Sequence, residues 1–354
     1  FNITDADTLK KLGNPKKPTS LVIWTTTPWT LPANLGIALN ANFEYSVYEA
    51  GEENLIIAKP LKEFFEKDTG IALTEGKVFL GKDLELGKAR HPFIARDSLI
   101  ILGEHVTADA GTGAVHTAPG HGVDDFKVGA QYNLGVLNPV NDAGAYTDEV
   151  PEYVDINVFK ANPMIVERLR ESGHLAGFKE IEHSYPHSWR SKTPLIYRTT
   201  PQWFMGIDLE GSEIRKKTLQ EIEKVEFYPE WGRARFQAMM ENRPDWCVSR
   251  QRIWGVPIPI LTCNATGEPF ADYEVMMKVA EIIEKQGGIE AYYKVPANDI
   301  VGNAWKNCDA AKKDPKFGSE GFRHGRDILD VWFDSGICHA AVQKKREGMA
   351  FPAD

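Results

Sequence analysis

Short apolar runs separated by polar turns dominate the first half of the chain. Runs rich in aromatic and β-branched residues predict strands at residues 21–24, 43–48, 54–58 and 98–102, with Gly or Asp clusters between them. The polar stretch before them contains Gly13, Pro15 and Pro18, and we interpret residues 1–18 as a linker. This texture is typical of a compact β-rich barrel with added helices.

Later segments repeat their apolar positions with helical spacing. Helices are predicted over residues 163–172, 213–225 and 273–285, with Gly173 and Gly287 following two of them and Ser212 as a candidate N-cap. Between residues 182 and 202, histidines and prolines crowd a region that is unlike either flank. We therefore expect a domain boundary there.

Composition narrows the class of protein. With 354 residues, 42% apolar and 26% charged, the chain has enough material for a sizeable core and more than one domain. No apolar run approaches a membrane span and the start lacks a signal sequence, so no membrane partner is expected. The chain also does not begin with Met, which is typical of an excerpt from a longer protein.

Charge and cysteine usage give further expectations. A formal charge of −9 argues against a general electrostatic grip on nucleic acid, so any RNA contact must be local. The densest basic run could meet phosphates or be solvated helix surface: Arg233, Arg235, Arg243, Arg250 and Arg252. The four cysteines are widely spaced without a Cys-x-x-Cys pair, which favours reduced thiols in a cytoplasmic protein.

A threonine-rich turn follows the first predicted strand. Residues 24–34 read Trp-Thr-Thr-Thr-Pro-Trp-Thr-Leu-Pro-Ala-Asn, so four hydroxyls and an amide lie on a turn stiffened by two prolines. Each hydroxyl can both donate and accept, which suits ribose hydroxyls, adenine edges and a water molecule. The alternative is a set of threonines that satisfy their own backbone.

A second constellation occupies residues 111–126. Its glycines and alanines allow a ligand to approach the backbone, while His116, His121, Asp124 and Asp125 supply titratable groups. Two His and two Asp could hold a metal, but they lack the spacing of known zinc motifs, and Gly-Thr-Gly lacks the Lys-Ser/Thr ending of a phosphate-binding loop. We therefore predict no metal here.

Together these segments resemble the editing insertion of class I aminoacyl-tRNA synthetases, most closely the isoleucine-specific branch. Valine- and leucine-specific relatives typically carry Thr-Thr-Arg-Pro where this chain has residues 25–28. Further resemblances lie at residues 189–194, 200–204, 243–255 and 330–336. The resemblance covers nearly the whole chain.

The resemblance implies an α+β fold class, with a β-barrel editing domain followed by a partial α/β (Rossmann-like) catalytic segment. It places the linker at residues 1–18, the editing domain at 19–185, a junction and helical segment at 186–245, and the partial catalytic domain with small insertions at 246–354. A zinc knuckle of some relatives is in doubt, because Thr266 follows Cys263 where they have a second cysteine.

The resemblance also implies residue roles. Asp125 would hold the α-ammonium of the attached amino acid, and His116 would exclude the branch of isoleucine while accepting valine; a buried structural histidine is the alternative. Thr27 and Thr30 are further candidate catalytic residues. The implied substrate-binding residues are Thr25, Thr26, Trp29, Asn34, Gly113, Ala114 and Val115, and those for the adenylate in an intact enzyme are Trp246, Gln251, Trp254 and Asp334.

The implied activity is hydrolysis of mischarged valyl-tRNA(Ile) by direct attack of water, with no cofactor. The intact enzyme would use ATP and Mg to join isoleucine to tRNA(Ile), and it is expected to be a monomer. The implied partners are the tRNA(Ile) acceptor end, and valine and isoleucine as esters or adenylates. Neither a His-Ile-Gly-His type nor a Lys-Met-Ser-Lys-Ser type motif occurs, so amino acid activation is not expected of this chain. A non-catalytic module that binds the tRNA acceptor end is the alternative.

Overall fold

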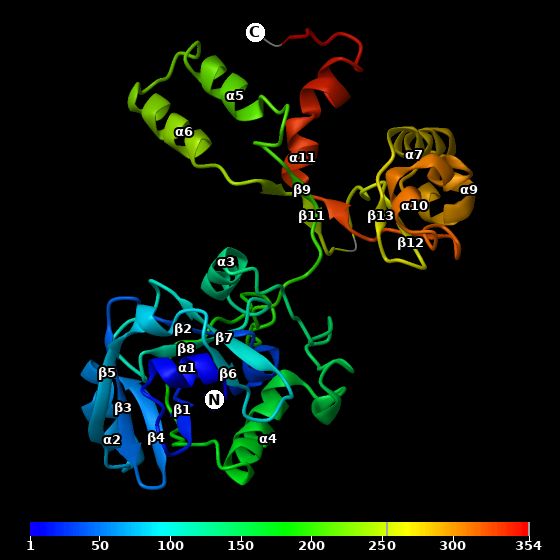
Figure 1. Cartoon of the computed structure of the whole chain (residues 1–354). Helices are drawn as coiled ribbons and strands as arrows, with labels where there is room; N and C mark the ends of the chain where they lie inside the picture. Colours follow the sequence, from blue (N-terminus) through cyan, green and yellow to red (C-terminus); the bar gives the residue numbers. More distant parts are fainter. Residues whose placement is uncertain (253, 353–354) are drawn as a thin grey trace. The chain divides into compact units, whose positions relative to one another are not determined.

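The chain forms two compact units, Phe1–Thr200 and Pro201–Asp354, in a computed structural model that describes residues 1–252 and 254–352 (Figure 1). Ile253, which belongs to one of the predicted motifs, lies outside the described residues. None of the helices in the described ranges has the length and apolar character needed to cross a membrane.

The first unit is built on two four-stranded sheets. One has the order β1 (Thr19–Leu21), β4 (Glu53–Ala58), β3 (Glu44–Ala50) and β5 (Thr74–Leu80). The other has the order β6 (Lys88–Arg90), β7 (Asp97–Leu102), β2 (Gly36–Leu39) and β8 (Ala114–Thr117). The predicted strands at 43–48, 54–58 and 98–102 correspond to β3, β4 and β7, whereas the first begins and ends earlier than predicted.

The expected closed barrel is not found. Asn2 bridges Ser20 of β1 and Arg90 of β6 and so links the two sheets edge to edge. Within residues 1–252 and 254–352, no ladder joins β5 to β8, so the linked sheets stay open. Closure requires every strand to pair on both sides, and the two outer strands here do not.

Apolar side chains cover both faces of the second sheet, which positions the site described below. Ile37 of β2 belongs to a large core cluster that also includes Trp29 and Leu31. Its neighbour Ala38 points the other way, into a small cluster with Val128 of α3 (Val123–Gln131). This alternation follows from the two-residue repeat of a strand.

The remaining helices of the first unit are α1 (Ala6–Lys11), α2 (Lys62–Thr69) and α4 (Val158–Glu171), with 3-10 turns η1 (Pro28–Ala33), η2 (Lys59–Leu61), η3 (Gly81–Leu84) and η4 (Pro151–Tyr153). The helix predicted from Pro163 starts earlier, because Asn157 caps it and accepts the Phe159 N–H. The proline then lies inside the helix, whose buried face includes Val158 and Ile165.

Residues 1–18 form part of the first unit, contrary to the linker that we predicted. Ile3 is buried and its N–H donates to the Thr19 carbonyl at 2.8 Å. Asp5 caps α1 through the Thr8 N–H at 2.9 Å, and Leu12 is buried. Most polar residues of this segment are exposed or half-exposed, apart from the buried Thr8, so its few apolar anchors were too sparse to form a recognisable pattern.

The second unit contains short helices around very short strands. Its helices are α5 (Ile214–Ile222), α6 (Trp231–Glu241), α7 (Tyr273–Gln286), α8 (Ala291–Lys294), α9 (Ala297–Val301), α10 (Asp309–Lys313) and α11 (Val331–Gly336), with η5 (Ala304–Asn307) and η6 (His339–Gln343). Glu213, not the predicted Ser212, is the N-cap of α5. The predicted helix at 273–285 corresponds to α7, which Asp272 caps and Gly287 ends in a left-handed conformation.

The strands of the second unit do not form the parallel sheet expected of a Rossmann-like segment. β9 (Phe204–Met205) pairs with β10 (Trp246–Cys247), β11 (Ser249–Arg250) with β15 (Ile328–Leu329), and β12 (Leu261–Cys263) with both β13 (Pro269–Phe270) and β14 (Phe322–His324). All of these ladders are antiparallel in the described residues. Strands of two or three residues are too short to support the long crossover connections of a parallel sheet.

Residues 186–200 belong to the first unit, so the observed division after Thr200 lies inside the boundary region predicted at 182–202 but later than the domain end at residue 185 that the resemblance implied. The Thr199 N–H donates to the Gly120 carbonyl at 2.8 Å, and the Arg198 guanidinium donates to the Val140 carbonyl at 2.8 Å. These bonds join segments far apart in sequence, and no local pattern could have predicted them.

Candidate functional site

The threonine turn, defined as Thr25, Thr26, Thr27 and Thr30, is held by the backbone of η1. Two prolines restrict the conformation of this 3-10 helix and remove two N–H donors. The carbonyl oxygens of Trp29, Leu31 and Pro32 accept hydrogen bonds from three distant side chains, namely Tyr146, His91 and Arg96. The turn is therefore fixed by two separate segments, residues 91–96 and the one that contains Tyr146.

Three hydroxyls of the threonine turn, those of Thr25, Thr27 and Thr30, form a connected chain. Thr25 Oγ1 accepts the Thr27 N–H at 3.0 Å and lies 3.3 Å from Thr27 Oγ1. Thr27 Oγ1 in turn lies 3.4 Å from Thr30 Oγ1. Thr26 is exposed, Thr25 and Thr27 are half-buried and Thr30 is buried, so the chain runs from the surface inward.

His116 anchors the inner end of this chain. Its Nε2 lies 2.8 Å from Thr30 Oγ1, and its Nδ1 lies 3.3 Å from Asn34 Nδ2. An amide nitrogen can only donate, so Nδ1 accepts and the ring proton sits on Nε2. Nε2–H then donates to Thr30, whose own proton goes to the Thr27 carbonyl at 2.8 Å.

Burial keeps this histidine neutral. His116 is 7% exposed, and desolvation lowers the pKa of its imidazole to about 4, with a smaller contribution from His121. Both ring nitrogens are used within the protein. The geometry is that of a group that positions other side chains.

Sequence analysis missed three residues that hold the site together. Ser98 donates to Asn34 Oδ1 at 2.5 Å, and this bond fixes the amide that bonds His116. Asn162 of α4 accepts the Trp29 N–H at 2.9 Å, and Tyr146 donates to the Trp29 carbonyl. Their partners are 64 to 133 residues away, so no spacing in the sequence signals them.

Asp125 lies in the first turn of α3, just beyond the end of β8. Its Oδ2 accepts the Ala118 N–H at 2.9 Å, and this bond closes the intervening loop. Burial raises the pKa of the Asp125 carboxyl, while the Ala118 N–H and the charge of His105 oppose the shift. In the described part of the chain, no hydrogen bond joins Asp125 to the threonine turn or to His116.

Trp29 and His121 are packed against each other rather than open to solvent. Their ring centroids lie 4.9 Å apart in an edge-to-face arrangement, and they are 3% and 8% exposed. The His121 Nδ1–H donates to the Tyr197 carbonyl at 3.0 Å. This burial is that of a core residue and does not favour the substrate-binding role that the resemblance implied for Trp29.

The structure does not bring Gly113, Ala114 and Val115 to one surface. A Cβ on Gly113 would lie 2.4 Å from Ala58 Cβ, so this glycine, at a φ of 77°, serves close packing. Ala114 is 1% exposed. Val115 packs in the α3-side cluster on the face of β8 opposite His116, so it cannot share a pocket wall with His116.

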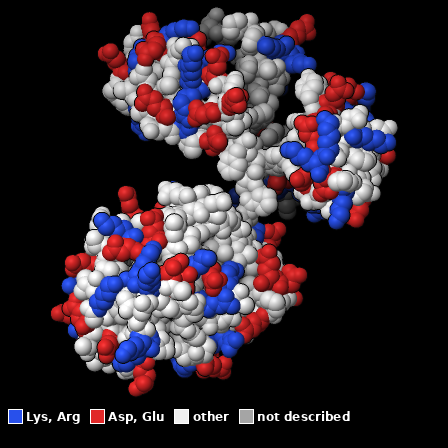
Figure 2. All heavy atoms as spheres, viewed as in Figure 1, with Lys and Arg blue, Asp and Glu red and all other residues white. Residues whose placement is uncertain are grey.

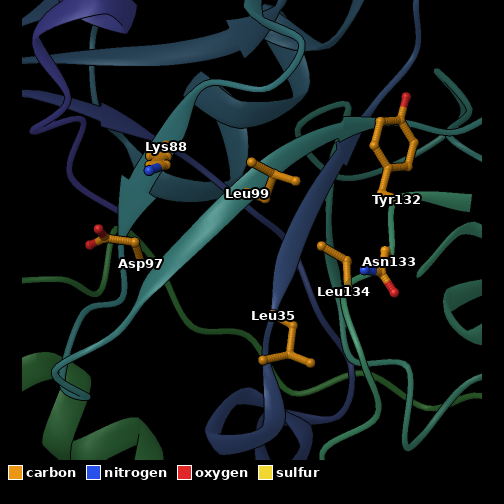
Figure 3. A pocket seen from close by; sticks show the side chains of 7 residues that line it. All are labelled: Leu35, Lys88, Asp97, Leu99, Tyr132, Asn133 and Leu134. Atoms are coloured by element: carbon orange, nitrogen blue, oxygen red, sulfur yellow. The ribbon is translucent and has the colours of Figure 1, made fainter. Parts of the chain in front are cut away.

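Two surface cavities lie outside the predicted site. One, of about 310 Å³, has an apolar wall of Leu35, Leu99 and Leu134, with Lys88 and Asp97 at one end (Figure 3). The other, of about 790 Å³, lies between the segment 40–42, the segment 102–105 and α3. Neither is lined by a residue that we predicted for the site.

The residues expected to meet the adenylate do not converge in the second unit. Trp246 donates its indole N–H to Asp330 Oδ2 at 3.0 Å, and Gln251 is exposed. Trp254 is 86% exposed, and Asp334 lies in α11. These four side chains share no contact in the described residues, so they do not form a fitting site for ATP and Mg, and we derive no step through either.

Asp330, the first residue of the 330–336 motif, was given no role from the sequence and is 4% exposed. Besides the Trp246 indole, its Oδ2 accepts the Arg250 guanidinium at 2.6 Å, and its Oδ1 accepts the Trp332 N–H at 3.2 Å. Arg250 is therefore paired inside the unit. Arg233 donates to three carbonyls at the end of α5, so two members of the predicted basic run have structural partners.

Charge is mixed over the surface that Figure 2 shows, with basic and acidic side chains interspersed on each unit. Within residues 1–252 and 254–352, no three His, Cys, Asp or Glu side chains gather in an arrangement that could hold a metal ion. Because basic and acidic side chains are mixed on this surface (Figure 2), a nucleic acid contact would have to be local.

The comparisons with known proteins identify the family. The profile of the class I tRNA synthetases (I, L, M and V) matches residues 16–354. The chain belongs to the class I tRNA synthetases. This family consists of enzymes, and the curated relatives similar to this chain include the isoleucine–tRNA ligases of Kosmotoga olearia and Geobacter sulfurreducens, with 47% and 45% identity.

These class I tRNA synthetase relatives are longer than the chain. The alignments cover 97% and 96% of this chain but 36% of each relative, so the chain spans about a third of their length. Among solved structures, the editing domains of the P. knowlesi and P. falciparum cytosolic leucyl-tRNA synthetases match at TM-scores of 0.40 and 0.37, each with 10% identity. The matches cover 49% and 44% of this chain, and 92% and 78% of the two editing-domain chains.

Proposed function

We propose that the chain hydrolyses valyl-tRNA(Ile) as the editing part of a cytoplasmic isoleucine–tRNA ligase whose intact form joins isoleucine to tRNA(Ile) with ATP and Mg. Membership of the class I tRNA synthetases and the similarity to isoleucine–tRNA ligases support this substrate class. A synthetic pocket gains only about 1–3 kcal/mol from one methylene; the isoleucine enzyme facing valine is the standard illustration of this limit. A second, hydrolytic site supplies the remaining discrimination.

The hydroxyl chain of the threonine turn carries the proposal. Thr25 and Thr27 are half-buried at its outer end, and neutral His116 fixes its inner end through Thr30. Fixed hydroxyls that both donate and accept can orient a terminal ribose and an attacking water. No Ser or Cys of the threonine turn or of residues 111–126 lies in a nucleophile-base motif, and the His116 nitrogen that faces Thr30 carries the ring proton and so cannot accept the Thr30 hydroxyl proton; water therefore attacks the ester directly.

Asp125 anchors the substrate amine in this proposal. The Ala118 N–H fixes one carboxylate oxygen, and an ionised carboxylate forms a charge-assisted hydrogen bond to the α-ammonium. His116, with 7% of its surface exposed, forms the back wall that excludes the branch of isoleucine. Replacing it with alanine should therefore allow hydrolysis of the correct isoleucyl ester.

Deacylation of valyl-tRNA(Ile) and isoleucyl-tRNA(Ile) by the full chain tests the proposal. The wild type should hydrolyse the valyl ester and spare the isoleucyl ester. Asp125→Asn keeps an oxygen for the Ala118 N–H but removes the charge, and should lower the rate on the order of 100-fold through loss of positioning. Asp124→Asn is the matched control, because it removes a neighbouring carboxylate that is exposed and pairs with Lys127.

The acid limb of the same reaction is a second readout. Since burial raises the pKa of Asp125 and the ionised form is needed, kcat/KM should fall as the pH is lowered through that raised pKa. The residual activity of Asp125→Asn should lack this limb. Normal hydrolysis by Asp125→Asn would refute the anchor, and binding of tRNA without turnover by the wild type would establish the non-catalytic acceptor-end module.

A further inference from the structure

A stretch of the first unit differs in charge from the rest of the chain. Residues 183–200 contain no Asp or Glu, although the chain carries 50 acids in 354 residues. The same stretch contains Arg190, Lys192 and Arg198. It is a locally basic segment in a protein of net charge −9.

Aromatic rings line one side of this segment, which we name the aromatic ribbon (residues 183–195). His183, Tyr185 and His187 occupy alternating positions, and alternating side chains of an extended chain share one side. The His183 and Tyr185 ring centroids lie 6.0 Å apart with their planes at 51°, and those of Tyr185 and His187 lie 6.1 Å apart with their planes at 84°. These three rings pack at an angle to one another, and Trp189 lies beyond them in a turn.

Hydrogen bonds fix the shape of the ribbon. His187 and Pro194 form an antiparallel bridge, and the Ser188 N–H donates to the Thr193 carbonyl at 2.9 Å. The Tyr185 hydroxyl donates to the Leu195 carbonyl at 2.8 Å across the two arms. A ligand would thus meet a preformed surface.

The tip of the ribbon presents an indole and two cations. Trp189 is 79% exposed, and the Arg190 guanidinium lies 5.3 Å from its ring centroid. Lys192 is also exposed, two residues further on. A large ring held out in water by a stabilised turn has surface available for a planar partner.

We infer that the aromatic ribbon binds single-stranded RNA, with a base stacked on the exposed Trp189 ring and phosphates paired with Arg190 and Lys192. Stacking suits any base because every base has a π face, and cations beside the rings neutralise the backbone. The absence of acids removes repulsion along the segment. We identify this RNA as the strand that leads to the ester-bearing end of tRNA, and this identification rests on the proposed function.

Fluorescence anisotropy of a labelled single-stranded RNA octamer with the full chain tests the inference. Trp189→Ala should weaken binding about 5- to 150-fold, the range seen when a stacking ring is removed, while Trp189→Phe should recover most of it. Arg190→Gln/Lys192→Gln should make the dependence of log K on log salt less steep by about 1.4, for two single-strand phosphates. A duplex of the same sequence should bind more weakly.

Matched variants control for general effects. Phe64→Ala removes a ring that is 57% exposed on α2, and Lys67→Gln/Lys82→Gln removes two exposed charges outside the ribbon. Both should bind RNA as the wild type does. Equal binding by Trp189→Ala, equal binding of the duplex, or no octamer binding by the wild type at low salt would each overturn the inference.

Deacylation kinetics separate this inference from the proposed function. If both hold, Trp189→Ala raises KM for valyl-tRNA(Ile) and leaves kcat unchanged. RNA binding through the ribbon by a chain that does not deacylate would refute the proposed function and leave the ribbon standing. Deacylation with an unchanged KM in Trp189→Ala would refute the ribbon alone.

Discussion

At the scale of single residues, the hydrogen-bond partners of His116 determine which of its ring nitrogens carries the proton. The Asn34 amide can only donate to Nδ1, which leaves Nε2–H for Thr30. A protonated imidazole would place a second N–H against that amide, within a buried site. This geometry and the desolvation that lowers the pKa to about 4 both favour the neutral ring.

This arrangement predicts a pH dependence of stability. The unfolded chain protonates His116 below about pH 6.5, but the folded chain only near pH 4, so the free energy of unfolding should fall as the pH drops between these values. The contribution is roughly 3 kcal/mol. Urea unfolding across this range should show a smaller decline for His116→Gln, and a stability difference independent of pH would contradict the assignment.

At the scale of elements, η1 depends on bonds from outside itself. Its prolines leave few internal hydrogen bonds, and Asn162 and Tyr146 hold the two sides of the Trp29 peptide unit. The threonine turn is continuous with η1, so its position depends on α4. A helix far away in sequence thus positions the proposed chemistry.

Asn162→Leu tests this dependence. It leaves the Trp29 N–H without its partner and should cost about 1–3 kcal/mol of stability, measured by thermal unfolding. The kcat of valyl-tRNA(Ile) deacylation should fall on the order of 10- to 100-fold as the turn shifts. Asn162→Asp keeps the accepting oxygen and should restore both. Unchanged kcat in Asn162→Leu would show that this bond does not position the turn.

Local sequence pattern predicted the strands and helices that bury one regular face. It failed for features that depend on hydrogen bonds between segments far apart in the sequence. β3, β4, β7 and α7 follow from short apolar runs or helical spacing with caps. Whether the linked sheets close depends on which strands pair. The helix α1 is held by a few buried apolar residues that pack beneath a polar surface. For the site, resemblance supplied Thr30, His116 and Asp125, whereas Ser98 and Asn162 act through partners that no sequence spacing reveals.

At the scale of the whole molecule, each unit has its own core. The two clusters of the first unit draw only on residues up to Ile196, and the cluster of the second unit runs from Leu261 to Phe322. Independent cores favour independent folding of the pieces that contain them. The position of the boundary then determines which hydrogen bonds the first unit keeps.

Truncation at residue 200 and at residue 185 compares the observed and predicted boundaries. The fragment 1–200 should unfold cooperatively near the Tm of this unit in the full chain. The fragment 1–185 loses the bonds that Tyr197, Arg198 and Thr199 make to His121, Val140, Gly120 and Asn138. At about 0.5–1.5 kcal/mol per bond, its Tm should fall by roughly 5 to 15 °C in calorimetry.

Among the lost hydrogen bonds, the one to His121 should reduce the stability most, because the loop that contains His121 leads directly into Asp125 and α3. Arg198→Gln in the fragment 1–200 is the matched control, since it removes one of these side-chain donors and leaves the chain length unchanged; its Tm should fall by a small part of the full loss. Equal stability of the fragments 1–185 and 1–200 would mean that residues 186–200 only lie against the first unit. In that case the shape of the aromatic ribbon would depend on the hydrogen bonds within residues 183–195.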